Sequence, residues 1–278
     1  MRGLRLGLRR GWITWRAVNT TREGLANTVF WNLVPLVVLI LLRNQQLEGF
    51  GVSATAALLP GIMAITVVFG VMGIAYYLAN EREDGTLLRA KATPGGMQAY
   101  VIGLVVVAAL DVAAGLLIVG VPGMFLLSGV PVGSAVLWLG LLGYLVLGLL
   151  ACLSVGLLIG SVVKNPRTIG GVGFLATAAL SALSGLFFPV QVLWGWVQVL
   201  VQLFPMYWLG LGLRSVFLPA EAAVLELGGS WRTVAGLLVL GGWAAVGLGL
   251  GPVLLRRMAR RESGSRVEAR REAALQRA

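Results

Sequence analysis

Long apolar runs separated by short polar stretches leave this chain very few architectures. Several runs extend over about 20 residues, the length that an α-helix needs to cross the hydrocarbon core of a bilayer. The chain is only 12% charged, whereas a soluble domain carries about 25% charged residues. Its 39 glycines favour close approach between membrane helices. We therefore predict an all-α, multi-pass membrane protein with a single domain over residues 1–278.

Six of the apolar runs are predicted to cross the membrane. They cover about residues 26–42, 54–79, 99–121, 133–163, 169–188 and 234–255. GxxxG spacings occur at Gly156/Gly160 and Gly247/Gly251. Such spacings favour close helix packing, although a glycine-rich chain also carries them by chance.

Residues 189–231, here called the Trp-rich segment, lie between the fifth and sixth predicted spans. The segment is apolar but interrupted by Gln191, Gln198, Gln202 and Pro205. We predict an extracellular re-entrant hairpin: two short helices, broken at Pro205, that enter the outer leaflet and return. Its aromatic residues are expected at the level of the lipid head groups; these are Trp194, Trp196, Tyr207 and Trp208.

Basic residues gather before the first span and after the last one. With both termini in the cytoplasm, the six-span arrangement places nineteen of the 22 Lys and Arg residues inside, as the positive-inside rule requires. We therefore predict cytoplasmic termini, a basic cytoplasmic tail over residues 256–278 and a location in a bacterial plasma membrane. The net charge of +11 is then assigned to topology and to contacts with anionic lipids, not to nucleic acid.

Residues 1–27 are predicted to form an amphipathic helix at the membrane interface. At about 100° per residue, Leu4, Leu8, Trp12, Trp15 and Val18 share one side, and Arg5, Arg9 and Arg16 share another. Trp beside Arg on such a helix suits the boundary between lipid and water. Trp12, Trp15 and Arg16 are therefore candidate site residues. The alternative is a floppy basic tail that only orients the protein.

The residue inventory excludes several kinds of chemistry. One cysteine and no histidine leave no disulfide framework, no Cys/His metal site and no His-based triad. The two lysines cannot complete a phosphate-binding P-loop, because Ala92 follows Lys91 and Asn165 follows Lys164. We therefore predict no catalytic residue, metal or cofactor in this chain, and any ATPase must be a separate polypeptide.

Asp111 is the one clear acidic residue in the middle of a predicted span. A carboxylate at the centre of a bilayer costs about 2.5–3.5 kcal/mol on insertion scales. We therefore expect Asp111 to face the interior of the bundle or a cavity. Two interpretations remain open: a residue of a transport pathway, or a hydrogen-bonded packing residue.

Residues 80–98, here called the charged segment, hold the one dense run of mixed charge away from the chain ends, NEREDGTLLRAKATPGGMQ. A short helix here would point its carboxylates towards the cytosol and its leucines towards the membrane core. Pro94, Gly95 and Gly96 then turn the chain into the third span. On the residues alone, the charged segment is either a docking site or an ordinary solvated turn.

Two motifs together resemble a known family. Within the charged segment, EREDGTLLRAKATPGG resembles the E-x-E-x-G-T-L…P loop of type-2 ATP-binding-cassette (ABC) transporter permeases. The later LSGLFFPVQVLWGWVQVLVQLFPMYWLGLGLR resembles their second signature, after the fifth span. The resemblance covers nearly the whole chain. One departure is Trp194, where the family often has proline, and it concerns the turn between the outer helices.

The resemblance implies a function and roles for individual residues. The ATPase-coupling loop would comprise Glu81, Arg82, Glu83, Asp84, Gly85, Thr86 and Leu87. The extracellular gate would comprise Gly185, Phe188, Pro189, Pro205 and Tyr207. Two permeases, identical or paralogous, would work with two ATPase subunits that bind ATP and Mg²⁺.

We thus predict the membrane subunit of an ABC exporter of the drug-resistance and natural-product branch, which would expel an amphipathic small molecule such as an antibiotic. Export of a lipid or lipid-linked saccharide is the nearest alternative within the family. From another class, an ATP-independent channel or a scaffold subunit is the alternative.

Overall fold

The computed structural model describes residues 2–47, 52–126, 133–163 and 165–261; Met1, Lys164 and residues 48–51, 127–132 and 262–278 lie outside these ranges. Within them the chain is mostly helical, with turns between the helices and one two-residue antiparallel pair, β1 (Gln46–Leu47) with β2 (Val52–Ser53). The helices are α1 (Arg2–Asn19), α2 (Arg22–Leu42), α3 (Ala54–Glu83), α4 (Thr86–Ala92), α5 (Gly96–Gly115), α6 (Val121–Phe125), α7 (Ala135–Val162), α8 (Pro166–Thr168), α9 (Phe174–Leu183), α10 (Gly195–Val201), α11 (Pro205–Phe217) and α12 (Thr233–Arg261). Two π-helical turns, η1 (Leu116–Gly120) and η2 (Ile169–Gly173), and two 3₁₀ turns, η3 (Val190–Val192) and η4 (Ala220–Leu225), join them.

Three of the long helices begin at a hydroxyl side chain. Thr21, Ser53 and Ser134 precede α2, α3 and α7, and each hydroxyl accepts a hydrogen bond from a backbone N–H in the first turn. These bonds satisfy donors that a helix leaves unpaired at its start. The polar residues between the apolar runs therefore fix where the long helices begin.

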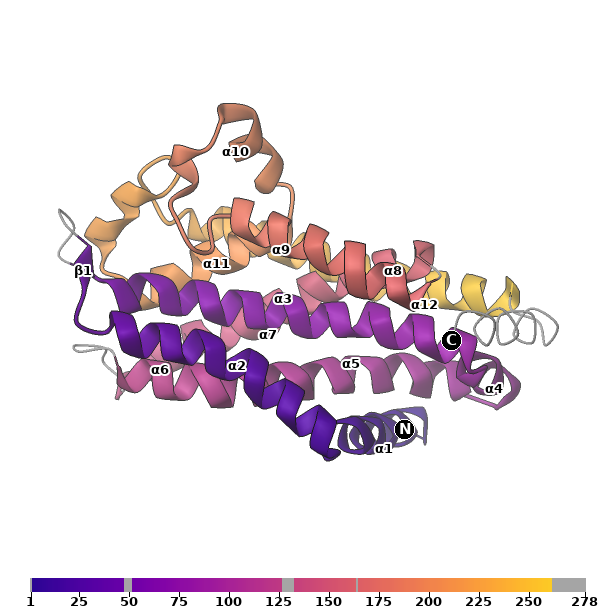
Figure 1. The fold of residues 1–278 in the computed structure, drawn as a ribbon. Coiled ribbons are helices and arrows are strands. Elements are labelled where there is room, and N and C mark those ends of the chain that lie inside the picture. Colours follow the sequence, from indigo (N-terminus) through magenta and orange to yellow (C-terminus); the bar gives the residue numbers. More distant parts are fainter. Residues whose placement is uncertain (1, 48–51, 127–132, 164, 262–278) are drawn as a thin grey trace.

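In the described part of the chain, five single helical stretches are long and apolar enough to cross a membrane. They are Arg22–Leu42, Ala54–Arg82, Gly96–Phe125, Ala135–Val162 and Thr233–Leu255, and they lie side by side in Figure 1. The prediction for residues 169–188 is wrong in extent, because α8, η2 and α9 end at Leu183. Gly185 then adopts a φ of +71°, a left-handed conformation that ends a helix. The six-span topology stays a prediction.

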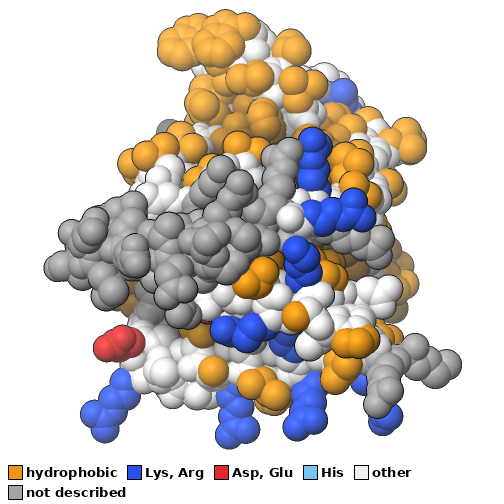
Figure 2. All heavy atoms as spheres, turned by 90° about the vertical axis from the view of Figure 1, so that its right-hand side faces the viewer, with side chains coloured by type: hydrophobic (Ala, Val, Ile, Leu, Met, Phe, Trp, Pro, Cys, Tyr) orange, Lys and Arg blue, Asp and Glu red, His pale blue; other side chains and the backbone are white. Residues whose placement is uncertain are grey.

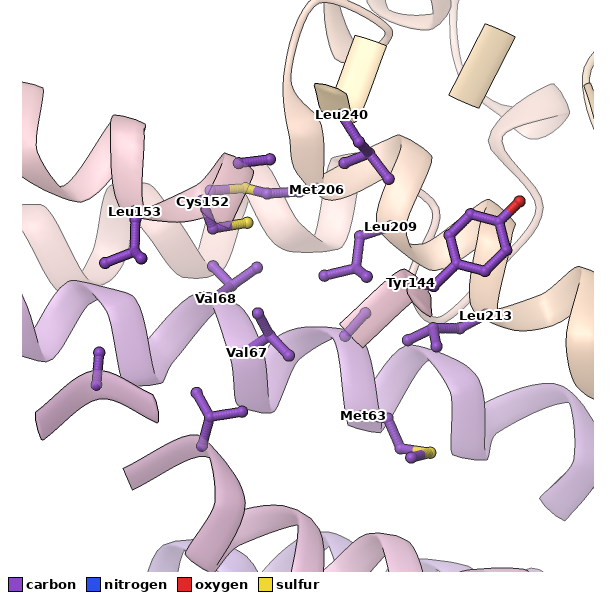
Figure 3. Close-up of a cluster of buried hydrophobic side chains, with 14 of the residues drawn as sticks. Met63, Val67, Val68, Tyr144, Cys152, Leu153, Met206, Leu209, Leu213 and Leu240 are labelled. Carbon is purple, nitrogen blue, oxygen red and sulfur yellow. The ribbon is translucent and has the colours of Figure 1, made fainter. Parts of the chain in front are cut away.

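The core brings together α3, α7, α11 and α12. Figure 3 shows Val67 of α3, Cys152 of α7, Leu209 of α11 and Leu240 of α12 in one apolar cluster. Every residue from Pro205 to Arg214 is buried, so α11 is a core helix. The depth of Tyr207 and Trp208 relative to the lipid head groups stays a prediction. Both side chains pack inside the protein, whereas Trp194 and Trp196 are exposed.

Helix α1 packs against α5 through a row of glycines. A Cβ placed at Gly7 or Gly11 would lie 2.5 Å from Cβ of Ile102 or Val106, closer than side-chain atoms pack. Glycine thus allows the two backbones to approach closely. The predicted interfacial helix over residues 1–27 is too long, because α1 ends at Asn19 and α2 begins at Arg22. Leu4, Leu8 and Trp12 remain exposed, as an apolar face in contact with lipid would be.

Glycines also allow α7 to approach its neighbours. A Cβ at Gly160 would contact Leu78 and Ala75 of α3, and a Cβ at Gly251 of α12 would lie 3.0 Å from Leu157 of α7. The GxxxG spacings at Gly156/Gly160 and Gly247/Gly251 therefore lie in helix contacts.

One end of the bundle carries α4, the start of α1 and the end of α12 (Figure 1). Figure 2 looks onto this end and shows Lys and Arg side chains spread over its described surface. Exposed basic residues on these helices include Arg5, Arg9, Arg89, Lys91, Arg257 and Arg260. The predicted tail at 256–278 begins too early, since α12 continues to Arg261; residues 262–278 lie outside the described ranges.

Candidate functional site

The charged segment is a helix–turn–helix and not an extended polar loop. Helix α3 continues to Glu83, and the seven-residue α4 follows. Gly85 and Gly95 flank α4 with φ angles of +76° and +72°, a region that non-glycine residues rarely occupy. The carboxylate of Asp84 accepts a hydrogen bond from the backbone N–H of Thr86 at 2.7 Å. These residues explain locally why the sequence E-D-G-T makes a sharp corner here.

Glu81 joins the charged segment to α1. Arg10 Nη2 donates to Glu81 Oε1 at 2.8 Å, and the two side chains are 24% and 14% exposed. The Arg10 guanidinium also lies 4.3 Å from the ring centroid of Tyr100 on α5, within the range of a cation–π contact. The expectation that the carboxylates face outwards is therefore wrong for Glu81, which holds three helices together.

Arg82 also points inwards. Its side chain is buried, and Nη1 donates to the carbonyl of Gly160 on α7 at 3.4 Å. Leu87 is buried against the core, as expected for the leucines of this helix. The side chain of Glu83 lies outside the described part. The outward surface consists of Asp84, Arg89, Lys91 and the turn up to Gly95, all exposed.

The other candidates on α1 lie beside this cluster. Trp12 and Trp15 stack with ring centroids 5.6 Å apart, and Arg16 is exposed. A second basic residue, Arg9, is exposed next to the paired Arg10. One helix therefore presents its basic residues in two different environments.

We expect a coupling energy of about 1 kcal/mol between Arg10 and Glu81, since the pair is partly shielded from water. A double-mutant cycle with Arg10→Ala and Glu81→Ala, read out by thermal unfolding of the purified protein, measures it. Arg9→Ala is the matched control and should leave stability unchanged. Additive effects of the two substitutions would show that the ion pair does not form.

A second polar cluster lies inside the Trp-rich segment. Arg214 of α11 donates from Nε to Glu226 Oε1 at 2.5 Å and from Nη2 to Glu226 Oε2 at 3.2 Å. Its Nη1 donates to the carbonyl of Gly185 at 2.8 Å. Both side chains are buried, and buried charges persist when they are paired and hydrogen-bonded. Arg214 thus fixes the loop after α9 onto α11.

The remaining gate candidates divide between the core and the surface. Pro205 begins α11 and Tyr207 is fully buried, whereas Phe188 and Pro189 are exposed. Helices α10 and α11 meet at 87°, which confirms two short helices broken near Pro205. The structure thus joins Gly185 to α11 through Arg214 and leaves Phe188 on the outside.

Three glutamines supply hydrogen bonds where the Trp-rich segment is not regular helix. Gln191 donates to the carbonyls of Val224 and Glu226. Gln198 donates to the carbonyls of Gln191 and Leu193. Gln202 donates to the carbonyl of Gln198 at 2.8 Å. Each side-chain amide thus satisfies backbone acceptors within its own segment.

Asp111 lies on the wall of a cavity, as expected for a charged residue within a span. Asn19 Nδ2 at the end of α1 donates to Asp111 Oδ1 at 3.1 Å. Thr28 of α2 in turn donates its hydroxyl to Asn19 Oδ1 at 2.9 Å. A cavity of about 740 Å³ between α2, α3, α5, η2 and α9 includes all three residues in its lining.

The members of these clusters that were not predicted from the sequence are Arg10, Asn19, Arg214 and Glu226. For Arg214 a signal existed: an ionisable residue in an apolar segment requires a partner, and Glu226 is a nearby carboxylate. For Arg10 and Asn19 no local signal existed, because their partners lie 71 and 92 residues away in the chain. Among the described residues, no three His, Cys, Asp or Glu side chains gather as a metal site would require.

The comparison with family models agrees with this architecture. No curated protein matches the chain. The family model described as ABC-2 type transporter matches residues 4–218, which include both the charged segment and α11. Membrane domains of this family are generally non-catalytic permease subunits that pair with an ABC ATPase subunit. The chain therefore belongs to the ABC-2 type transporter family, as a multi-pass membrane protein.

Proposed function

We propose that this chain is the permease subunit of an ATP-driven exporter that moves an amphipathic small molecule out of a bacterial cell. Two separate ATPase subunits bind ATP and Mg²⁺ and supply the energy. A second permease, identical or closely related, completes the pathway. Both termini lie in the cytoplasm, and membrane lipids surround the helices.

The arrangement of the charged segment carries this proposal. Helix α4 lies between two left-handed glycines at the basic end of the bundle, and Arg89 and Lys91 face outwards from it. The Arg10–Glu81 pair connects the same segment to α1. A force applied to α4 by a closing ATPase pair therefore reaches α1, α3 and α5 together.

The second permease is supported by the sparse packing of α2. In its most apolar 18-residue window, 6% of the residues are buried, against 59% for α3. Phe30, Val37 and Leu41 of α2 are all exposed, so a wide apolar surface is available to a partner subunit. The apolar and aromatic character of this region supports an amphipathic substrate.

Charge reversal on α4 tests the coupling. Arg89 and Lys91 are exposed. Arg89 donates to the Thr86 hydroxyl at 2.8 Å and forms a 4.0 Å pair with Asp84, exposed contacts that contribute little to stability. The double variant Arg89→Glu/Lys91→Glu should therefore insert and fold normally. We expect ATP-driven transport in inside-out vesicles, with the partner ATPase present, to fall at least about tenfold, since two charge reversals at a docking surface cost more than 1.4 kcal/mol.

Arg43→Glu is the matched control, because this exposed residue follows α2 at the opposite end of the bundle. The control should transport at the wild-type rate. Transport by Arg89→Glu/Lys91→Glu at the wild-type rate, or transport without any ATPase subunit, would contradict the proposed function.

A further inference from the structure

The cavity beside Asp111 has the size and shape of a binding site for a small molecule. Its volume is about 740 Å³, and ligand pockets in proteins generally span about 300–1,000 Å³. At about 1.5 Å per residue, Asp111 lies about 22 Å along α5 from Gly96, deep within the bundle and well away from α4. The cavity is therefore distinct from the surface that the charged segment presents.

The charge of the cavity wall has one sign. Of the described residues that line the cavity, Asp111 alone is charged, and none is Lys or Arg. Asn19 donates one hydrogen bond to Oδ1 of its carboxylate. A carboxylate has about four lone-pair positions, so Asp111 retains capacity to accept from a ligand. On the α3 side, a Cβ added at Gly73 would lie 4.0 Å from Asp111 Oδ2 and 3.8 Å from the Tyr77 ring, so a larger side chain there would crowd the carboxylate.

Several residues of the cavity lining are aromatic. Phe174 of η2–α9 lies between Phe69 of α3 and Trp31 of α2, with ring centroids 4.9 Å and 6.1 Å apart. Tyr76 and Tyr77 of α3 also line the cavity. Aromatic faces attract cations within about 6 Å of the ring centroid, and they also accept the apolar part of a ligand. Trp31 and Phe174 are 57% and 39% exposed, so these two side chains reach the protein surface.

We propose that this cavity binds an amphipathic organic cation. Its positively charged nitrogen lies against Asp111, and its apolar part lies against Trp31, Phe69 and Phe174. This inference rests on the proposed function and specifies the charge of the exported molecule. Asn19 and Thr28 are positioning residues, because they hold the Asp111 carboxylate through the chain of hydrogen bonds described above.

Electrostatics favours a cation over the other ligand classes. An anion would meet the Asp111 carboxylate without any basic residue in the described lining to offset it. A neutral ligand would displace water from the carboxylate and leave it without a counter-ion, which is costly at membrane depth. A cation removes that cost when it binds, so the ligand and the carboxylate stabilise each other.

Equilibrium binding to the full chain in nanodiscs, without ATPase or ATP, tests the inference. The two probes are an aryl-alkyl trimethylammonium ion and its uncharged tert-butyl isostere, which share one shape. We expect the wild-type protein to bind the cation about 10- to 100-fold more tightly, the ratio that one charged contact provides. Asp111→Asn should reduce this ratio to within about twofold, whereas Glu221→Gln, an exposed carboxylate on η4, should retain it.

A second variant leaves the carboxylate in place. Gly73→Leu should fill the space beside Asp111 and weaken binding of both probes at least about tenfold, because it removes volume and not charge. Equal affinity of the wild type for the two probes, an unchanged ratio in Asp111→Asn, or wild-type binding by Gly73→Leu would each overturn the inference. ATP-driven transport without a charge preference would overturn it and leave the proposed function standing. Cation-selective binding together with transport that needs no ATPase would overturn the proposed function and leave the cation site standing.

Discussion

Replacing Arg214 with methionine should lower the free energy of unfolding by about 3–5 kcal/mol, the cost of breaking a buried ion pair from one side. The substitution leaves the Glu226 carboxylate buried without its bidentate partner, and it removes the donor to the Gly185 carbonyl. Thermal unfolding in detergent measures the loss.

The double variant Arg214→Met/Glu226→Leu separates the ion pair from general damage. Replacing both charges by apolar groups of similar size is often close to neutral, so the double variant should regain most of the lost stability. Arg43→Met, at an exposed position, should unfold like the wild type. A double variant no more stable than Arg214→Met would contradict the assignment of the effect to an uncompensated charge.

Leucine at both Gly7 and Gly11 should detach α1 from α5 and abolish transport while the long helices still insert. Each added side chain would overlap Ile102 or Val106, and overpacking of this kind costs about 1–3 kcal/mol per site. Detachment also breaks the Arg10–Glu81 pair, so the charged segment loses its connection to α1. Gly143→Leu is the matched control, because a Cβ there meets nothing within 4 Å.

A disulfide reports the position of α1 directly. A Cβ at Gly3 would lie 3.7 Å from Cβ of Gln98, within the usual range of about 3.5–4.5 Å for a disulfide. Gly3→Cys/Gln98→Cys, in a background that carries Cys152→Ala, should cross-link under mild oxidation. Adding Gly7→Leu/Gly11→Leu should prevent the cross-link. Efficient cross-linking in that variant would show that α1 stays in place.

The regular parts of the fold follow from local properties of the sequence. Apolar runs predict most of the long helices, and Thr21, Ser53 and Ser134 mark the starts of three of them. The predicted turn at Pro94, Gly95 and Gly96 is confirmed, because Gly95 has a φ of +72°, which suits glycine. The family motifs are continuous stretches of sequence, which is why they could be found without a structure.

The parts that sequence reasoning missed depend on which surfaces meet. Hydropathy does not distinguish a helix surrounded by lipid from one surrounded by protein, so the burial of α11 and of Tyr207 was not predictable. The Glu81 side chain points inwards because it pairs with Arg10, which lies on α1, 71 residues earlier in the chain. The same holds for Asp111 and Asn19, whose contact defines one wall of the cavity.

The glutamines of the Trp-rich segment help that segment to remain stable in an apolar environment such as the membrane interior. A backbone carbonyl without a donor is costly in such surroundings, and Gln191, Gln198 and Gln202 bring donors on the same short stretch. These carbonyls therefore find their hydrogen-bond donors within the Trp-rich segment itself and need none from other helices. Leucine in place of these glutamines would raise the hydropathy of the segment. It would also leave backbone carbonyls without donors, so the segment would be less stable in an apolar environment.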